Sequence, residues 1–200
     1  RCLSFLRPLG LRLRLVVREM ADMLSLDLVD KGQVTDQLIL TIGYDIENLK
    51  DPNIRKDYHG AITTDHYGRA IPKHATGTTN LERHTTSTKL LTQAILELYG
   101  RIVDPKLLIR RISISANHVV REEDAPKNDA AEQLDLFTDY AAKQQKQAEE
   151  EAELAREKKM QETMLTIKKR FGKNAILKGM NLEEDATARE RNSQIGGHRA

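Results

Sequence analysis

The hydrophobic positions of residues 13–30 recur every three to four residues, which is the spacing of an amphipathic helix. Gly32 follows the last of these positions and is a typical helix stop. We therefore expect a helix over residues 13–30, with a buried face formed by Leu13, Val16, Val17, Met20, Leu24 and Leu28.

A second pattern, the alternation of apolar and polar residues, marks three later segments and is typical of half-buried strands. The first segment is D-Q-L-I-L-T-I-G-Y-D, the second covers residues 73–82, and the third covers residues 107–119. In the second segment, one side carries Ala75, Gly77, Thr79 and Leu81. Residues 45–72 show no clear period and contain many turn-forming residues, so we expect a long loop there.

A second helix is predicted between the last two strands. Thr85, Thr86 and Ser87 are favourable N-cap residues. Apolar residues then follow at helical spacing, and Gly100 is expected to close the helix; these residues are Leu90, Leu91, Ala94, Ile95 and Leu98. The order helix, strand, strand, helix, strand predicts an α+β fold, with a small, largely antiparallel sheet, two helices on one face, and the other face open.

The character of the chain changes after this domain, which we place at residues 13–120. Residues 121–138 form a polar linker. Residues 139–170 are rich in Ala, Glu, Gln and Lys, which predicts a long, charged, solvated helix whose apolar end around Met164 packs on something. We expect an irregular tail over residues 171–200, and we treat residues 1–12 as an atypical N-terminal segment.

Composition adds a weak indication about partners. Charged residues make up 31% of the chain and aromatic residues only 4%, and the net charge is +2. Residues 1–120 hold 17 Lys and Arg against 13 Asp and Glu, whereas residues 121–200 hold 15 against 17. The first part is therefore the more basic one, which favours a polyanionic partner for it.

The sequence also bears on the cellular compartment of the protein and on whether the chain is a fragment. Cys2 is the single cysteine, so no intramolecular disulfide can form. No apolar run approaches the roughly 18 residues that a membrane span needs. Arg7 and Arg12 interrupt the apolar N-terminal residues, which argues against a secretory signal. We expect a cytoplasmic protein without a membrane partner, and a fragment of a longer one, since position 1 is not Met.

The sequence shows no catalytic constellation and no metal site. There is no Gly-rich phosphate loop and no Cys and His cluster with metal-ligand spacing. The His and Asp residues of the predicted loop are scattered and unpaired, and we interpret them as solvated turn residues. We therefore assign no catalytic residue, no metal ligand and no small-molecule substrate to this chain.

The open face of the sheet is the first candidate site. Hydroxyl, amide and cationic side chains donate hydrogen bonds to phosphate oxygens without selecting a base sequence. The N–H groups at Thr86 and Ser87 could in addition bind a phosphate at a helix start. The DNA-binding candidates are Lys73, His74, Thr76, Thr78, Arg83, Thr86, Ser87, Arg110, Arg111, Ser113 and Ser115. The alternative is that any solvent-facing strand is polar, and the pattern alone does not decide between the two.

The second candidate site is the short apolar motif Q-L-D-L-F inside the polar linker. It consists of Gln133, Leu134, Asp135, Leu136 and Phe137. An extended peptide with two Leu and one Phe can fill a hydrophobic pocket on another protein while the linker acts as a tether. The alternative is that these side chains fold back on the domain. We favour docking, because both flanks are strongly polar.

These segments together resemble a known family. Q-L-D-L-F resembles the sliding-clamp-binding peptide of bacterial DNA polymerases. V-T-D-Q-L-I-L-T-I-G-Y-D, P-K-H-A-T-G-T-T-N-L-E-R-H-T and R-R-I-S-I-S-A-N-H-V-V occur in the order found in the little-finger domain of UmuC-like Y-family translesion polymerases, the ImpB/MucB/SamB group. The tail from K-N-A-I-L-K-G-M to R-N-S-Q-I-G-G-H resembles the same group, so the similarity spans roughly residues 15–200.

The resemblance implies a little-finger-like βαββαβ module whose sheet lies along the DNA major groove and contacts mainly the backbone. It also implies two partners, template-primer DNA and the bacterial sliding clamp. Two parts of the family pattern are missing. The palm domain that would carry the catalytic magnesium is absent, so we expect no cofactor in this chain and no polymerisation by it alone. The first strand is also not recognisable before residue 13, so we expect the sheet to lack a central strand.

The leading functional hypothesis is therefore damaged-DNA binding in translesion synthesis and DNA repair. The chain would grip the template-primer backbone and tether the polymerase to the clamp. The alternative is a protein–protein adaptor that uses the helix at residues 139–170 and does not bind DNA.

Overall fold

The centre of the fold is strand β1 (Gln33–Tyr44), which pairs antiparallel with a strand on each side. The computed structural model describes residues 9–126, 140–195 and 198–199. One neighbour of β1 is β4 (Ala75–Thr85) and the other is β5 (Ile109–Asn117). A two-residue strand, β6 (Val120–Arg121), pairs with the start of β1. The sheet is thus small and antiparallel, as the sequence predicts.

The alternation of β1 places one set of side chains in the core and the other set on the open face. Leu38, Leu40 and Ile42 are fully buried. Their cross-strand neighbours on β5 have the same orientation, because Leu40 lies opposite Ile114 and Ile42 lies opposite Ile112. The predicted core side of the sheet is therefore confirmed.

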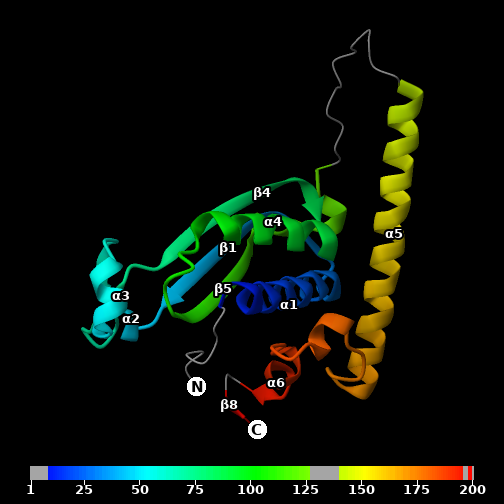
Figure 1. The fold of residues 1–200 in the computed structure, drawn as a ribbon. Helices are drawn as coiled ribbons and strands as arrows, with labels where there is room; N and C mark the ends of the chain where they lie inside the picture. Colours follow the sequence, from blue (N-terminus) through cyan, green and yellow to red (C-terminus); the bar gives the residue numbers. More distant parts are fainter. Residues whose placement is uncertain (1–8, 127–139, 196–197, 200) are drawn as a thin grey trace.

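Two helices cover this side of the sheet (Figure 1). Helix α1 (Leu9–Asp30) begins four residues earlier than predicted and is followed by Gly32, whose φ of 62° suits a helix stop. Helix α4 (Thr88–Ile102) runs beyond Gly100, so the prediction that this glycine closes the helix is wrong. Both helices bury apolar side chains in one cluster with β1, among them Leu13, Val17, Ala21, Leu28, Leu91, Ile95 and Leu98.

The segment between β1 and β4 is not the long loop that the sequence predicts. It contains α2 (Glu47–Lys50), α3 (Pro52–Asp57), and a hairpin of β2 (Ile62–Thr64) and β3 (Ala70–Pro72). The buried side chain of Asn48 ties this segment to the entry of β5. Its Nδ2 donates to the carbonyl oxygen of Leu108 at 2.9 Å, and its Oδ1 accepts from the Leu108 N–H at 2.7 Å. This contact spans 60 residues of sequence, so local patterns do not reveal it.

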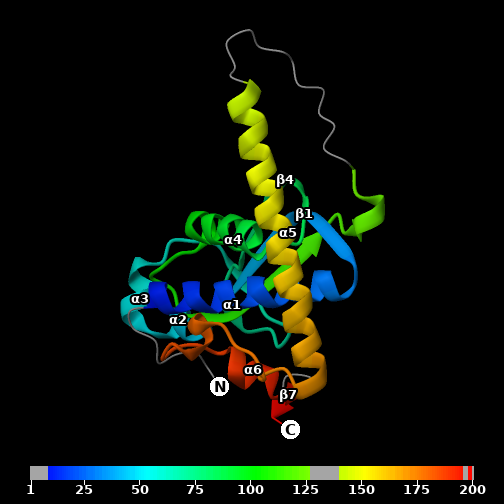
Figure 2. The same ribbon diagram turned by 90° about the vertical axis from the view of Figure 1, so that its right-hand side faces the viewer.

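Helix α5 (Tyr140–Phe171) follows the short helix η1 (Glu122–Asp124) and crosses the two-layer domain on one side (Figure 2). The prediction of a long charged helix is confirmed. Residues 145–153 are exposed, whereas Gln161 and Met164 are buried. The Gln161 Nε2 donates to Ser25 Oγ of α1 at 2.7 Å and to the Thr86 carbonyl at 3.0 Å. The buried polar contacts of α5 with α1 and with the start of α4 thus lie in its second half.

The tail contains short elements rather than only irregular chain: η2 (Gly179–Leu182), α6 (Ala188–Asn192), β7 (Gln194–Ile195) and β8 (His198–Arg199). It is held against α1 by polar contacts to Glu19, whose side chain is fully buried. The Glu19 carboxylate accepts hydrogen bonds from Asn181 Nδ2 at 3.0 Å, from Thr187 N–H at 2.9 Å and from Arg191 Nη2 at 3.1 Å.

The expected missing strand does not leave a gap in the sheet. Residues 1–8 lie outside the described part of the chain, and residues 9–12 belong to α1. The central position is occupied by β1, which pairs directly with β4 and β5. Among the described residues no strand precedes α1, as the sequence predicts, and the sheet is closed by direct pairing of the remaining strands.

Candidate nucleic-acid interface

The open face of the sheet carries cross-strand rows of hydroxyl groups. Thr41 of β1 lies between Thr76 of β4 and Ser113 of β5. The Thr76 hydroxyl donates to Thr41 Oγ1 at 3.3 Å. The next row places Thr78 and Ser115 on either side of Ile39. The predicted residues Thr76, Thr78, Ser113 and Ser115 thus share one face, which is the face opposite to α1 and α4.

A row of three amides closes this face at one end. Asn117 of β5 donates through Nδ2 to Gln37 Oε1 at 2.6 Å. Gln37 in turn donates through Nε2 to Asn80 Oδ1 of β4 at 2.8 Å. Each amide orients the next, because an amide has one accepting and one donating end. This chain of hydrogen bonds fixes the register of the three strands at the solvent-facing surface.

Cationic side chains lie at the other end of the open face. Arg111 lies opposite Gly43, and a register shift between Gly43 and Tyr44 leaves Arg110 between two paired positions of β5. Both Arg residues are exposed, as are Lys73 and His74, which precede β4. None of these four side chains forms a hydrogen bond or an ion pair with another part of the chain that the structure describes. The charges of Arg110, Arg111 and Lys73 are therefore available to an anionic ligand.

Three predicted residues lie elsewhere. Arg83 lines a cavity of about 440 Å³ between β4, α4 and α5, together with acidic residues of α5 such as Glu150 and Glu157. The Thr86 carbonyl accepts from Ser25 Oγ at 2.7 Å. Ser87 is buried and serves as the N-cap of α4. The alternation of β4 continues as far as Arg83, which has the same phase as Leu81 and so points away from the row of Thr76 and Thr78.

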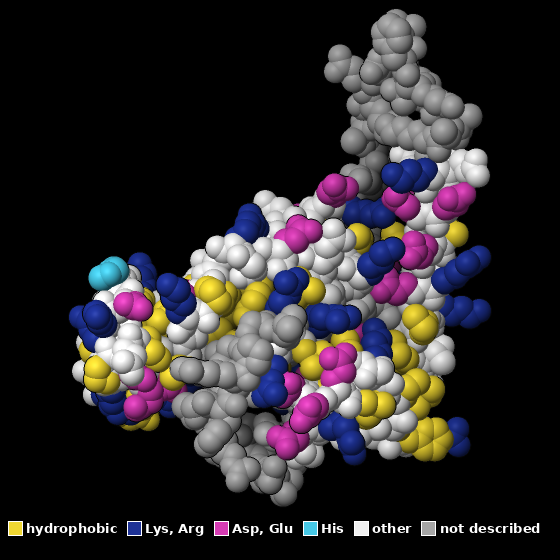
Figure 3. Space-filling model, viewed as in Figure 1, with side chains coloured by type: hydrophobic (Ala, Val, Ile, Leu, Met, Phe, Trp, Pro, Cys, Tyr) yellow, Lys and Arg dark blue, Asp and Glu magenta, His cyan; other side chains and the backbone are white. Residues whose placement is uncertain are grey.

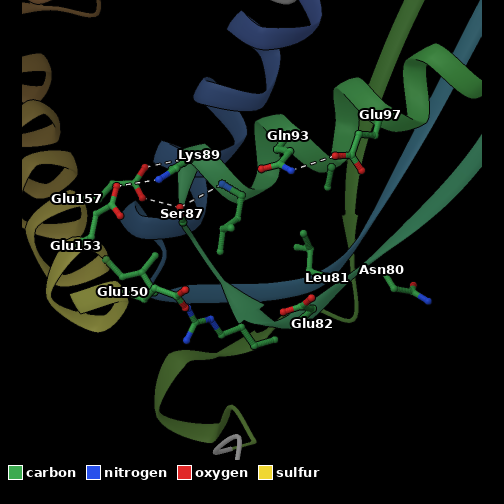
Figure 4. Close-up of a pocket in the computed structure, with 14 residues that line it drawn as sticks. Asn80, Leu81, Glu82, Ser87, Lys89, Gln93, Glu97, Glu150, Glu153 and Glu157 are labelled. Atoms are coloured by element: carbon green, nitrogen blue, oxygen red, sulfur yellow. Dashed lines mark hydrogen bonds and ion pairs between the residues drawn. The ribbon is translucent and has the colours of Figure 1, made fainter. Parts of the chain in front are cut away.

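The N-terminus of α4 is occupied by a carboxylate of this chain (Figure 4). Ser87 Oγ donates to Glu157 Oε2 at 2.6 Å, and the Lys89 N–H donates to Glu157 Oε1 at 3.3 Å. The Ser87 N–H donates to Thr85 Oγ1 at 3.0 Å. Ser87 is therefore not available to a phosphate in this structure, and its role is corrected to that of a helix cap facing α5. A negative charge at a helix N-terminus is favourable, which explains why Glu157 lies there.

A second carboxylate strengthens the same junction. Lys89 Nζ forms an ion pair with Glu153 Oε1 at 2.9 Å. The hydrogen bond to Glu153, followed by the attraction of the Glu153 charge, raises the pKa of Lys89 above its ordinary value of 10.5. The cation thus stays charged at the α4–α5 junction and is not part of the open sheet face.

Some residues of the open face are not among the sequence-based candidates. Gln37, Ile39 and Thr41 of the central strand face the same solvent as Thr76 and Ser113. The signal was present in the sequence, because these three residues alternate with the buried residues of the same strand. The candidate clamp-binding residues Gln133, Leu134, Asp135, Leu136 and Phe137 lie outside the described residues.

Residues 9–126, 140–195 and 198–199 lack two further features. In this part of the chain, no helix is both long enough and apolar enough to cross a bilayer. The same residues contain no group of three or more His, Cys, Asp or Glu side chains that could hold a metal ion.

Comparison with known proteins agrees with the arrangement of the sheet and its helices. The model of the impB/mucB/samB family C-terminal domain matches residues 4–136, which is well over half of the chain. The matched region includes α1, α4, all strands of the central sheet, and most of the Q-L-D-L-F motif. No curated protein matches the chain. The chain therefore belongs to the impB/mucB/samB family and corresponds to a C-terminal part of a UmuC-like Y-family polymerase, the group that acts in DNA-damage bypass.

Proposed function

We propose that this chain binds template-primer DNA through the open face of its sheet and tethers the polymerase to the sliding clamp through residues 133–137. The observation that carries the DNA-binding proposal is the register of the three strands. It places Thr76, Thr78, Ser113 and Ser115 on one solvent-facing surface, and Arg111, which has no partner among the described residues, lies at its end.

Hydroxyl and guanidinium groups in such rows match the repeated phosphate oxygens of a nucleic acid backbone. The described part of this face carries no aromatic side chain, so it offers no stacking platform for unpaired bases. Binding here is therefore expected to depend on salt and to be nearly independent of base sequence. In this proposal the chain supplies no catalytic group and no metal, and nucleotide incorporation by the chain alone would contradict it.

The DNA-binding part is tested by titrating a fluorescent primed duplex with the full chain at several salt concentrations. We expect Arg111→Ala to weaken binding equally for several base sequences. The slope of log affinity against log salt should fall by about 0.9 for the lost phosphate contact. Arg101→Ala is the matched control, because Arg101 is an exposed cation in the last turn of α4, on the helical side of the sheet. A loss confined to one base sequence, or an equal loss in both variants, would argue against backbone binding by the sheet.

The clamp-binding part is supported by the Q-L-D-L-F motif and by the family to which the chain belongs. We expect Phe137→Ala to abolish capture of the chain by an immobilised bacterial sliding clamp while leaving DNA affinity unchanged. Phe171→Ala is the matched control, since Phe171 is 67% exposed at the end of α5. Undiminished capture of the Phe137 variant would refute this part of the proposal.

The alternative function, an adaptor without DNA binding, has one observation in its favour. Residues 145–153 of α5 are exposed along their whole length. These residues are almost entirely polar or Ala, so they present no apolar stripe of the kind that helix-in-groove binding uses. An absence of affinity for primed duplex at low salt would decide for the adaptor.

A further inference from the structure

The hairpin of β2 and β3 displays an aromatic ring to solvent. Tyr67 lies between the two strands and is 77% exposed. Tyr44 and Tyr99, in contrast, are buried in the core. Tyr67 is the most exposed large hydrophobic side chain of the described residues, and its rigid ring presents a flat contact surface to solvent.

The turn that carries Tyr67 is held by one carboxylate. Asp65 Oδ1 accepts hydrogen bonds from the N–H groups of Tyr67 and Arg69, each at 2.9 Å. Asp65 Oδ2 accepts from Arg69 Nε at 2.8 Å. Gly68 adopts a φ of 74°, which closes the turn without strain. The position of the ring is thus fixed before any ligand arrives.

The ring also has a cation against it. The Arg69 guanidinium carbon lies 4.9 Å from the centroid of the Tyr67 ring. The His66 ring meets Tyr67 edge-on, with centroids 5.4 Å apart and an interplanar angle of 71°. The same guanidinium forms an ion pair with Asp65 at 2.6 Å, so Arg69 joins the ring to the turn and its charge is matched within the hairpin. The group that remains for a ligand is the exposed aromatic ring of Tyr67.

The hairpin is anchored at the cationic end of the open sheet face. The Lys73 N–H donates to the Ala61 carbonyl at 2.8 Å, so the strand that leaves the hairpin continues directly into β4. Ile54 and Tyr58 pack against the core and fix the preceding segment. Figure 1 shows α2 and α3 at the end of the sheet far from α5. The hairpin therefore lies at the same end of the sheet as Arg111, which is opposite Gly43 near the end of β1.

Charges at this end are mixed. Figure 3 shows Lys and Arg side chains gathered there, with Asp and Glu side chains among them. Lys56 and Lys73 are exposed cations without a partner in the described residues, whereas Asp57 is an exposed acid. These cations are sufficient for individual phosphate contacts, but this end of the molecule does not form a large, purely positive surface.

We infer that Tyr67 is a stacking site for an unpaired base of DNA, at the place where the single strand leaves the duplex that the sheet face holds. This inference rests on the proposed DNA-binding function and assigns a second element to it. The bases of a duplex are stacked on each other and do not reach a protein ring, whereas unpaired bases stack on aromatic side chains regardless of their sequence. The sheet face has hydroxyls and cations but no ring, and the hairpin adds the ring at the end of that face.

The test uses a primed duplex with a 2-aminopurine at the first unpaired template position, together with a blunt duplex of the same paired length. The full chain should quench the 2-aminopurine fluorescence on binding. We expect Tyr67→Ala and Tyr67→Leu to remove the quenching and to weaken binding to the overhang substrate by about fivefold to a hundredfold. Blunt-duplex affinity should not change. Tyr67→Phe should retain both the quenching and the affinity, since the ring is what stacks.

Phe171→Ala is the matched control on the protein side. Phe171 is also exposed and also has a guanidinium beside it, with Arg170 Cζ at 5.1 Å from its ring centroid. It lies at the end of α5, away from the hairpin (Figure 1). Its removal should leave the quenching intact, which separates stacking at the hairpin from nonspecific attraction to aromatic side chains.

The outcomes separate this inference from the proposed function. If Arg111→Ala weakens both substrates but Tyr67→Ala changes neither, the stacking site is refuted and the sheet interface stands. If Tyr67→Leu behaves like the unaltered chain, the residue acts as a general apolar contact and the inference is also refuted. If the unaltered chain binds neither substrate at low salt, both proposals fall.

Discussion

The buried carboxylate of Glu19 gives the sharpest prediction about how the tail is held. Its two oxygens accept four hydrogen bonds from the tail, one of them from the Thr187 hydroxyl at 3.0 Å. The Glu19 side chain is fully buried, and the Arg191 side chain is 25% exposed. Burial lowers the pKa of Arg191 below its ordinary value, and the nearby Glu19 charge opposes this effect. The Glu19 carboxylate therefore helps to keep the Arg191 guanidinium charged.

Glu19→Ala leaves the Arg191 guanidinium and the Asn181 amide without their acceptor. Removing one partner of a buried ion pair costs about 3–5 kcal/mol, because the remaining charge is left uncompensated. Glu19→Gln keeps one acceptor oxygen but loses the charge and presents an NH₂ group to one set of donors, so we expect a smaller loss of about 1–3 kcal/mol. The order of stability is therefore unaltered chain, Gln variant, Ala variant.

The assay is hydrogen exchange of backbone amides in the tail, combined with urea unfolding followed by circular dichroism. The Arg191 N–H, which donates to the Thr187 carbonyl at 2.9 Å, reports local opening of the tail. A loss of about 3 kcal/mol corresponds to a decrease in its protection of more than about a hundredfold. Asp27→Ala is the matched control, because Asp27 is an exposed acid on the same helix. Equal protection in Glu19→Ala and Asp27→Ala would refute the assignment of Glu19 as the anchor of the tail.

Two further predictions concern the sheet and the hairpin. A Cβ atom at Gly77 would lie 2.8 Å from Leu98 Cδ1, so Gly77→Ala should lower the free energy of unfolding by about 1–3 kcal/mol. In Gly43→Ala the added Cβ would meet no atom closer than 3.4 Å, so this control should change the free energy of unfolding little. Equal urea midpoints for the two variants would contradict the close approach of α4 to β4. The hydrogen bond from Arg69 lowers the pKa of Asp65 below 3.8. Since the folded-state pKa is depressed, the stability that Asp65 gives the turn is present above pH 3.8 and is lost as the pH falls through the folded-state value. NMR titration of the Asp65 carboxyl carbon should show this midpoint, and Arg69→Ala should raise it toward 3.8; an unmoved midpoint would exclude Arg69 as the cause.

Local periodicity was enough to predict the sheet and its two faces. In β1 the buried residues Leu38 and Leu40 alternate with Gln37, Ile39 and Thr41, and the structure has the same alternation. This works because successive side chains of a strand point to opposite faces, so the pattern states directly which residues share a surface. Periodicity also located α1 and α4, although not the start of α1 or the end of α4, since helix ends depend on single capping contacts. Composition and helix propensity located α5 to within one residue at each end.

Sequence patterns did not determine which side chains neutralise one another. The sequence around Ser87 predicts a helix cap that is open to solvent. In the structure, however, the Ser87 hydroxyl donates a hydrogen bond to Glu157, 70 residues away. A charged residue such as Glu19 in a helix is usually exposed to solvent, but in the structure the tail covers its side chain. A charge pattern gives the position of a charge along the chain, whereas its partner is decided by the packing of distant segments.

The sequence by itself therefore determined the α+β class and the open polar face, which follow from the period of neighbouring residues, and the long charged helix, which follows from composition and helix propensity. Only the tertiary structure decided that Ser87 faces α5, that Asn48 fixes the segment before the hairpin, and that Tyr67 is presented at the end of the sheet. These features depend on contacts between segments far apart in the chain, and such contacts leave no periodic signal in the sequence.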